Sequence, residues 1–313
     1  MFEIKRYEPS HEQAWNDFVA RSKNGTFLFD RRFMDYHSDR FADSSLIILR
    51  KGRIYALLPA NRVGDTLHSH QGLTYGGLLT DAKATAEGVM EAFGTLNAWL
   101  RNEGVRRVTY KAMPWIYHRL PAEEDLYALT QVCHARLLTR EISSTILLQQ
   151  PLRFTESRKS GLRKALREGL YMEESGDLAA FWQMLDDNLA SRHHTHPVHS
   201  LDELRLLQGR FPQQIHLYLI YNKEKEPVGG TWVFDTGQVV HTQYIASTKE
   251  GKAHGALDLL FDELINRRYH EGIYLDFGKS TEEGGRVLNE HLIFQKEGFG
   301  GRGVCYDTYE WEP

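Results

Sequence analysis

Cysteine is rare in this chain of 313 residues: only Cys133 and Cys305 occur, far apart in the sequence. At most one disulfide is therefore available, and chains with so few cysteines are more often found reduced in the cytosol. An excess of charge of one sign is also lacking, because the formal net charge is only -4. This excludes a field that would draw the whole molecule to DNA or to an anionic membrane, so any basic site must be local.

Long hydrophobic runs are missing as well. Glu3 and Lys5 place charge at the very start of the chain, which lacks the apolar block of a signal peptide. The longest stretch without acidic or basic residues, 66–80, is rich in His, Ser, Thr and Gly, so it cannot span a bilayer. We therefore expect a cytoplasmic protein without a membrane span and without DNA as a partner.

The hydrophobic share of 41% and the charged share of 26% are typical of a globular chain with its own core. At about 150 residues per domain, the length indicates two domains. One order of elements, β-α-α-β-β-β-α-β-α-β, is repeated. The first copy is expected to have strands at 2–7, 45–50, 53–62, 66–75, 106–111 and 135–148 with a long helix at 81–103. The second is expected to have strands at 170–174, 215–221, 227–234, 239–246, 273–277 and 303–311 with helices at 177–191, 201–209, 256–269 and 286–296.

In the second copy, a basic, glycine-containing loop from Ser247 to Gly255 connects the strand 239–246 to the long helix. Free backbone N–H groups and the positive end of the helix dipole meet at such a turn, and Lys249 and Lys252 add positive charge. The pattern indicates an anion site, although a glycine turn before a helix is as often a plain loop.

This loop resembles the loop of the GNAT acyltransferase fold that holds the pyrophosphate of acyl-CoA. Gly251, Lys252 and Ala253 supply its Gly-x-Ala pattern, while Thr248 stands where the family has Arg or Gln. Three further segments match a narrower group. They are Arg158 to Ala165 with Gly169, Arg192-His193 leading to Pro197-Val198-His199-Ser200, and Leu275-Asp276-Phe277-Gly278 leading to Phe294 to Gly300. Together they resemble the FemAB-like tandem GNAT proteins, which include peptidoglycan-bridge aminoacyl transferases and proteins of cell-envelope and polysaccharide clusters.

The resemblance implies an α/β (α+β) chain of two tandem GNAT-like domains, each a mixed, largely antiparallel sheet flanked by helices. Residues 1–150 would form a domain with a degenerate donor site, and residues 151–313 a domain with the donor site. The implied activity is transfer of an acyl or aminoacyl group to an amine of a small molecule or a peptidoglycan precursor. The donor is acetyl-CoA or another acyl-CoA, with aminoacyl-tRNA as the alternative, and no cofactor is tightly bound.

Acyl transfer needs a stabilised oxyanion and a base for the amine. The resemblance places the oxyanion donors in the backbone around Tyr244, Ile245 and Ala246. For the base we predict Asp276, because it lies near the C-terminal end of the strand 273–277, where ligands gather in open α/β sheets. The alternative is that Asp276 caps the turn at Gly278. A catalytically idle sugar- or peptide-binding protein with the same fold also remains open.

Four histidines, at 193, 194, 196 and 199, lie within seven residues. His193 and His199 match the family pattern, so they are predicted to act at the acceptor with Arg192, in a loop between two helices. A metal site, and with it a metal-dependent hydrolase, is disfavoured because the helical His-Glu-x-x-His pattern is missing and Pro197 favours a loop. Ser200 and Glu203 form a capping box, which supports a purely structural role for that end.

The remaining substrate-binding candidates are basic or glycine-rich. Lys159 and Arg163 share a helix face with Arg167 and suit an RNA backbone or a phosphate-bearing acceptor, although a solvated face explains them equally well. Lys279 is a candidate by resemblance. In the first copy, Tyr75, Gly76 and Gly77 are predicted to line a cleft between the copies. The Thr80-Asp81 pair there favours capping of the long helix over phosphate binding.

Overall fold

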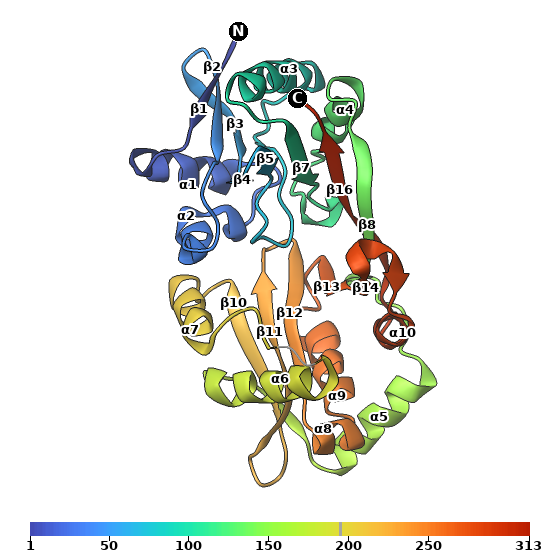
Figure 1. Cartoon of the computed structure of the whole chain (residues 1–313). Helices are drawn as coiled ribbons and strands as arrows, with labels where there is room; N and C mark the ends of the chain where they lie inside the picture. The colour runs from blue at the N-terminus through green and yellow to red at the C-terminus, as the bar shows by residue number, and fades with distance from the viewer. Residues whose placement is uncertain (194–195) are drawn as a thin grey trace. The chain divides into compact units, whose positions relative to one another are not determined.

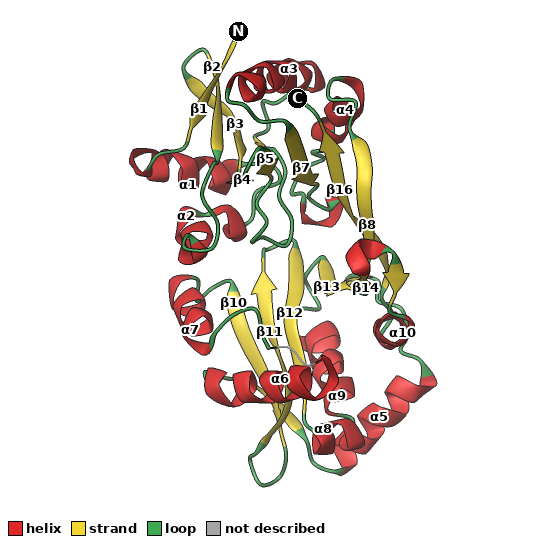
Figure 2. Cartoon of the chain, viewed as in Figure 1, coloured by secondary structure: helices red, strands yellow, loops and turns green. Residues whose placement is uncertain are grey.

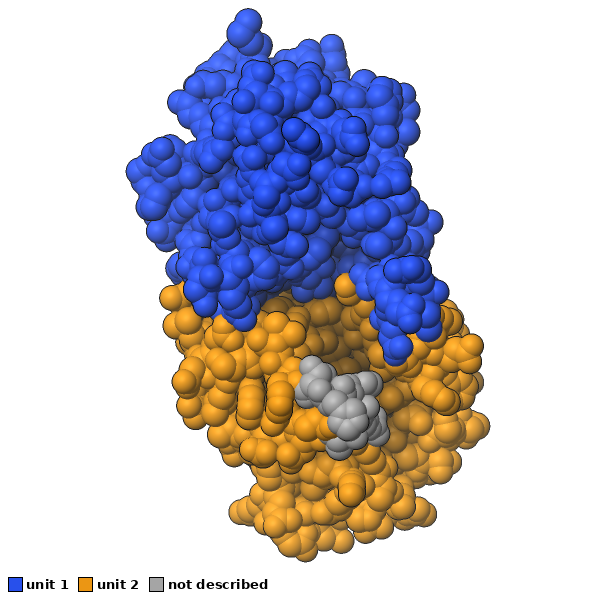
Figure 3. Space-filling model, in the orientation of Figure 1, with its two compact units in different colours: residues 1–142, 281–287, 305–313 blue, residues 143–280, 288–304 orange. Residues whose placement is uncertain are grey.

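The computed structural model describes residues 1–193 and 196–313. Contacts divide the chain into two compact units, both discontinuous in sequence (Figure 3). Unit 1 comprises Met1–Ile142, Thr281–Val287 and Cys305–Pro313, and unit 2 comprises Ser143–Ser280 and Leu288–Val304. No helix in the described ranges has both the length and the apolar character needed to cross a membrane.

Unit 1 contains an antiparallel sheet with the order β1 (Phe2–Arg6), β2 (Leu46–Arg50), β3 (Arg53–Leu58) and β6 (Leu79–Thr80) (Figure 1). A second group of strands has the order β4 (Asn61–Val63), β5 (Thr66–His68) and β7 (Arg107–Lys111), and β7 pairs antiparallel with β16 (Arg302–Trp311). The helices are α1 (Glu12–Arg21), the short α2 (Arg31–Met34), α3 (Ala86–Asn102) and α4 (Glu124–Gln131).

Helical spacing of apolar residues explains why these helices pack. In α1, Trp15, Phe18 and Val19 fall on one face and are buried. The core of unit 1 joins α3 to the strands through Phe93, which lies near the buried rings of Tyr110 and Trp311. Because Trp311 belongs to the last strand, the end of the chain completes the core of the unit that begins it.

Unit 2 has strands in the order β8 (Arg136–Leu147), β13 (Tyr274–Lys279), β12 (Val239–Ser247), β11 (Pro227–Asp235), β10 (Ile215–Tyr221) and β9 (Tyr171–Glu174). All neighbouring pairs are antiparallel except β12 and β13. The helices are α5 (Glu156–Arg167), α6 (Leu178–His193), α7 (Leu201–Arg210), α8 (Lys249–His254), α9 (Ala256–Glu263) and α10 (Glu290–Gly298). The helix α6 packs on β11 and β12, and α9 packs on β10 and β11.

The expected fold class is confirmed, because both units have mixed, largely antiparallel sheets flanked by helices (Figure 2). Several local expectations differ from the structure. The strand expected at 53–62 is divided into β3 and β4, which belong to different sheets, and the helix expected at 286–296 begins at Glu290. The helix expected at 81–103 begins at Ala86, because the hydroxyl of Thr85 accepts a hydrogen bond from the Gly88 amide and caps it there. The strand expected at 66–75 ends at His68, just before the left-handed backbone of His70, whose φ is 64°.

Candidate active site in unit 2

Strands β12 and β13 are paired over a short length only. Their parallel ladder joins Val239–His241 to Tyr274–Asp276, although β12 continues to Ser247. A β-bulge against β11 follows, between Trp232 and Val233, and it makes Gln243 the extra residue of β12. Within the described residues, the ladder between β12 and β13 thus ends at His241, and the rest of β12 runs on beyond it. The predicted oxyanion residues Tyr244, Ile245 and Ala246 lie in this part of β12.

The predicted base Asp276 lies in β13, at the last residue pair of that ladder, and its side chain is fully buried. Its carboxylate accepts hydrogen bonds from the hydroxyls of Ser143 and Thr145 on β8. The second carboxylate oxygen lies 2.9 Å from Nδ1 of His241, its partner residue on β12. A buried carboxylate is tolerated where its oxygens are hydrogen-bonded, and these three side chains supply the hydrogen bonds. The carboxylate is therefore held by protein groups, and His241 is the titratable side chain that it orients.

The turn after Asp276 leaves space beside the His241 ring. Gly278 has a φ of 75°, and a Cβ added there would lie 3.3 Å from Cε1 and 3.9 Å from Nε2 of His241. The buried Lys296 of α10 fixes the same turn, because its ammonium donates to the carbonyl oxygens of Gly278 and Lys279 and to the Ser280 hydroxyl. Burial lowers the pKa of Lys296 to about 8, while the Asp276 charge opposes the decrease. The candidate Lys279 has an exposed side chain.

Of the histidine segment, His199 is the predicted site residue whose side chain the structure describes. It is buried, and its Nδ1 lies 2.5 Å from the hydroxyl of Tyr244 on β12. Its carbonyl oxygen accepts a hydrogen bond from the indole of Trp182, which connects the segment to α6. Arg192 and His193 end α6, and their side chains lie outside the described residues, as does all of His194. The expected capping box of Ser200 and Glu203 is present at the start of α7.

The basic loop after β12 forms one side of a pocket of about 680 Å³. Lys249, Lys252 and the predicted Gly251 and Ala253 lie in α8, and Gly255 joins α8 to α9 with a left-handed φ of 77°. The hydroxyl of Thr248 accepts a hydrogen bond from the Gly251 amide, so this side chain caps the helix. A side chain at Gly251 would collide with the carbonyl oxygen of Val228. The glycine is thus required for close packing of α8 on β11.

The charges around this pocket do not favour a phosphate. Lys249 and Lys252 line it together with three acidic residues, Asp187, Glu226 and Glu250. The ammonium of Lys252 donates a 2.6 Å hydrogen bond to the side-chain oxygen of Asn188 on α6, so it already has a partner. The loop therefore has the expected position after β12, but its surroundings carry more negative than positive side chains.

The other candidates lie apart from this strand edge. Lys159 and Arg163 belong to α5, where Lys159 forms an ion pair with Glu156. In unit 1, Tyr75 is buried and its hydroxyl lies 3.2 Å from that of Thr26. Side chains at the two adjacent glycines would crowd Ser69 and Tyr110 respectively, so Gly76 and Gly77 serve close packing inside unit 1. The cleft predicted for these three residues stays a prediction.

Sequence reasoning missed His241, which has no recognisable motif around it. The only signal in the sequence was that His241 follows two valines within an expected strand, and the polar residues Thr242 and Gln243 come directly after it. Its partner Asp276 was found, but the pairing of the two depends on the register between strands far apart in sequence.

Comparisons with known proteins concern the domain family and the fold. Residues 155–284 match the family model described as an acetyltransferase (GNAT) domain. The crystal structure of FemX is similar, with a TM-score of 0.68 and 11% identity over 99% of this chain and 97% of that one. The structure of L-PGS from Bacillus licheniformis has a TM-score of 0.62 and 13% identity, over 97% of this chain and 92% of that one. The tandem GNAT protein from the clavulanic acid biosynthesis pathway has a TM-score of 0.51 and 12% identity, over 100% of this chain and 98% of that one. No curated protein matches the sequence.

Residues 155–284 are thus a GNAT acetyltransferase domain, and the whole chain has the fold of FemX. The expected GNAT-like second copy is confirmed by the family model, and the expected tandem fold is confirmed by the likeness to FemX and to a tandem GNAT protein. So is the expectation of an acyltransferase, which follows from the matched acetyltransferase domain.

Proposed function

We propose that this protein transfers an acyl or aminoacyl group from an activated donor to an amine at the edge of β12, with His241 as the general base. The observation that carries the proposal is the hydrogen bond between His241 Nδ1 and the buried carboxylate of Asp276, 2.9 Å long, at the residue pair where the β12–β13 ladder ends. A histidine oriented by a buried carboxylate, beside the part of β12 that runs beyond its ladder with β13, combines a base with backbone that is placed to serve as an oxyanion site.

In the proposed reaction, Nε2 of His241 takes a proton from the attacking amine as the new C–N bond forms. The Asp276 carboxylate accepts the Nδ1 hydrogen bond and stabilises the imidazolium, so Asp276 acts as a positioning residue through His241. Backbone N–H groups among Tyr244, Ile245 and Ala246 stabilise the oxyanion. The imidazolium then returns the proton to the departing thiolate or ribose oxygen as the bond from the acyl carbon to that group breaks.

The donor is an acyl-CoA, such as acetyl-CoA, or an aminoacyl-tRNA. The capped α8 loop and its three acidic neighbours weaken the case for a diphosphate held there. This favours the aminoacyl ester, whose reactive end carries no diphosphate. The proposed acceptor is a small-molecule amine or a peptidoglycan precursor in cell-envelope or polysaccharide metabolism, and the proposed compartment is the cytoplasm. His193, His199 and Arg192 are proposed to line the acceptor side.

The test measures transfer to a panel of primary amines by mass spectrometry, with acetyl-CoA in one arm and aminoacylated bulk tRNA in the other. We expect one arm to give product, and the variants His241→Gln and Asp276→Asn to lower kcat by about a hundredfold or more, with little change in KM. His216→Gln is the matched control, because His216 Nδ1 also lies 2.7 Å from a carboxylate, that of Glu174, but on β10. It should retain full activity.

Three results would contradict the proposal. A His241→Gln variant that transfers the acyl group at the wild-type rate would show that another group takes the proton. An equal loss in His216→Gln and His241→Gln would show that both substitutions act through folding. Absence of transfer in both arms would favour a catalytically idle binding protein with the same fold.

A further inference from the structure

The helix α5 lies at the outside of unit 2, where it packs on α9 and α8 (Figure 1). On its inner face, Arg158 forms an ion pair of 3.0 Å with Asp258 of α9. Its outer face presents cations to solvent, because Lys159, Arg163 and Arg167 are spaced four residues apart and therefore follow one another along the helix. We call these three residues the basic ridge of α5.

The cations toward the end of the basic ridge are not neutralised. Over residues 1–193 and 196–313, no acidic side chain lies within ion-pair distance of Arg163, Lys164 or Arg167. Within the same residues, Lys223 of the β10–β11 hairpin is a fourth unpaired cation. It lies beside the end of α5, because a Cβ added at Gly169 would be 2.6 Å from its Cε. The helix dipole favours cations in the last turn, which explains Lys164 and Arg167 but neither of the other two.

An apolar side chain lies beside the basic ridge. Leu166 is 56% exposed, although it directly precedes Arg167 and follows Arg163 by one turn. Leu162, one turn before Leu166 on the same side of the helix, is half-buried. The helix has no aromatic residue on which a nucleic-acid base could stack. Cations next to an exposed leucine suit an anionic lipid surface, because its phosphates attract the charges and its acyl chains accept the apolar side chain.

We propose that α5 docks the protein on an anionic lipid surface. The four unpaired cations contact the lipid phosphates, and Leu166 enters the boundary of the acyl chains. Each Lys or Arg near such a surface favours binding by about fivefold, so four together favour it by on the order of a thousandfold. Salt screens charges beyond about 10 Å, so the net charge of -4 of the whole chain does not oppose this local attraction. The docking surface goes beyond the proposed acyl transfer, because it uses none of the residues near His241.

The test measures cosedimentation of the full-length protein with vesicles of phosphatidylcholine and phosphatidylglycerol, and with vesicles of phosphatidylcholine alone. We expect binding to the mixed vesicles only, and this binding should weaken as salt is added. Arg163→Gln combined with Arg167→Gln should weaken it by about twentyfold or more, because each substitution removes one contribution of about fivefold. Both side chains are exposed, so the variant is expected to fold, and circular dichroism would verify this.

A second variant separates a lipid surface from other polyanions. Leu166→Ser keeps every charge of α5 and should weaken vesicle binding by about fivefold, because the burial of a leucine side chain among the acyl chains is lost. A polyanion without an apolar phase would not respond to this substitution.

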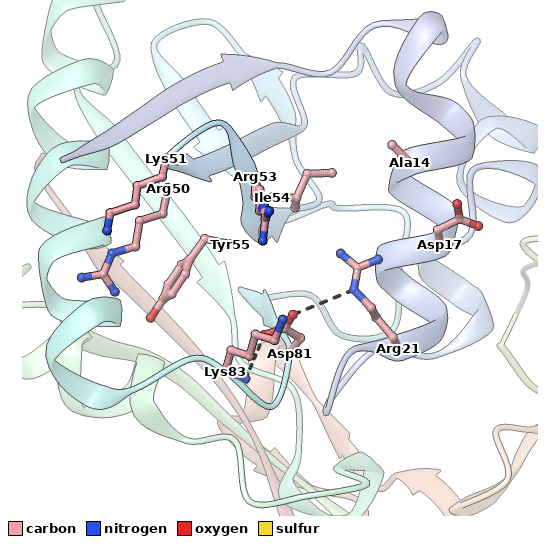
Figure 4. A pocket seen from close by; sticks show the side chains of 10 residues that line it. All are labelled: Ala14, Asp17, Arg21, Arg50, Lys51, Arg53, Ile54, Tyr55, Asp81 and Lys83. Carbon is pink, nitrogen blue, oxygen red and sulfur yellow. Dashed lines mark hydrogen bonds and ion pairs between the residues drawn. The ribbon is translucent and has the colours of Figure 1, made fainter.

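The matched control removes two positive charges from unit 1. Arg53 and Lys83 are exposed and line a pocket of about 960 Å³ in that unit (Figure 4). Arg53→Gln with Lys83→Gln makes the same change in net charge as the α5 variant, and it should bind the mixed vesicles like the wild type.

The proposal is overturned if the protein does not bind the mixed vesicles, if binding survives the double arginine substitution or Leu166→Ser, or if the control weakens it equally. Binding of bulk tRNA that depends on Arg163 and Arg167, without binding to vesicles, would overturn it as well and assign the basic ridge to RNA. None of these outcomes depends on acyl transfer, so the proposed function is tested separately.

Discussion

Lys296 should make the protein gain stability as the pH rises above 8. This lysine is buried in α10, and burial lowers its pKa from 10.5 to about 8. A lysine whose pKa is lower in the folded state than in the unfolded state carries a penalty at low pH, because folding buries the charged form. Between pH 8 and pH 10.5 the unfolded chain holds the extra proton, so the penalty is relieved as the pH rises.

The size of the effect follows from the shift. One pKa unit corresponds to about 1.4 kcal/mol, so the full penalty below pH 8 is roughly 3 kcal/mol. Between pH 7.5 and pH 9.5, about 2 kcal/mol of this should be recovered. Lys296→Met removes the titrating group. It also removes the donor to Gly278, Lys279 and Ser280, but that loss changes little with pH and adds a constant offset.

The assay is urea-induced unfolding of wild type and Lys296→Met at several pH values from 7 to 9.5, followed by circular dichroism. The difference between the two proteins at each pH isolates Lys296, because tyrosines and Cys133 titrate alike in both. Over this range, we expect the free energy of unfolding of the wild type to rise by about 2 kcal/mol relative to that of the variant. Parallel curves would refute the reasoning, since they would mean that the pKa of Lys296 is the same in the folded and unfolded states.

Two further predictions concern unit 1 and the loop of unit 2. Burial, with help from nearby positive groups, lowers the pKa of His70 to about 3, so stability present above pH 6.5 should be lost as the pH falls. Asparagine tolerates the φ of 64°, so His70→Asn removes the titrating group without new backbone strain. Between pH 7 and pH 5, the free energy of unfolding measured in urea should fall by about 2 kcal/mol less in this variant than in the wild type. Gly255→Ala should lower stability by about 2 kcal/mol or more, because the residue has a φ of 77° and its Cβ would collide with the carbonyl of Gly161. Gly94→Ala is the control, because Gly94 lies in α3 with open space around it, and it should raise stability by about 0.5–1 kcal/mol. Thermal unfolding measures both variants, and equal shifts of the two unfolding midpoints would contradict the argument.

Local patterns in the sequence determined the elements and several of their ends. Apolar spacing predicted the buried face of α1, with Trp15 and Phe18, and the capping box predicted the start of α7 at Ser200. The repeated order of elements predicted the tandem architecture, and the glycine pattern located the loop at Gly251. These inferences succeed because side-chain periodicity, capping and turn chemistry act between residues only a few positions apart.

Only the tertiary structure decided which residues meet. His241 reaches Asp276 through the register of β12 and β13, and Ser143 reaches the same carboxylate from a strand 133 positions away. Lys223 reaches the end of α5 at Gly169 from a separate hairpin in the same way. Strand register and hairpin placement depend on packing over the whole core, and this information is not carried by any short stretch of sequence. The sequence by itself therefore determined the fold and the position of the loop, whereas packing determined the proposed base, its carboxylate and the position of Lys223 beside α5.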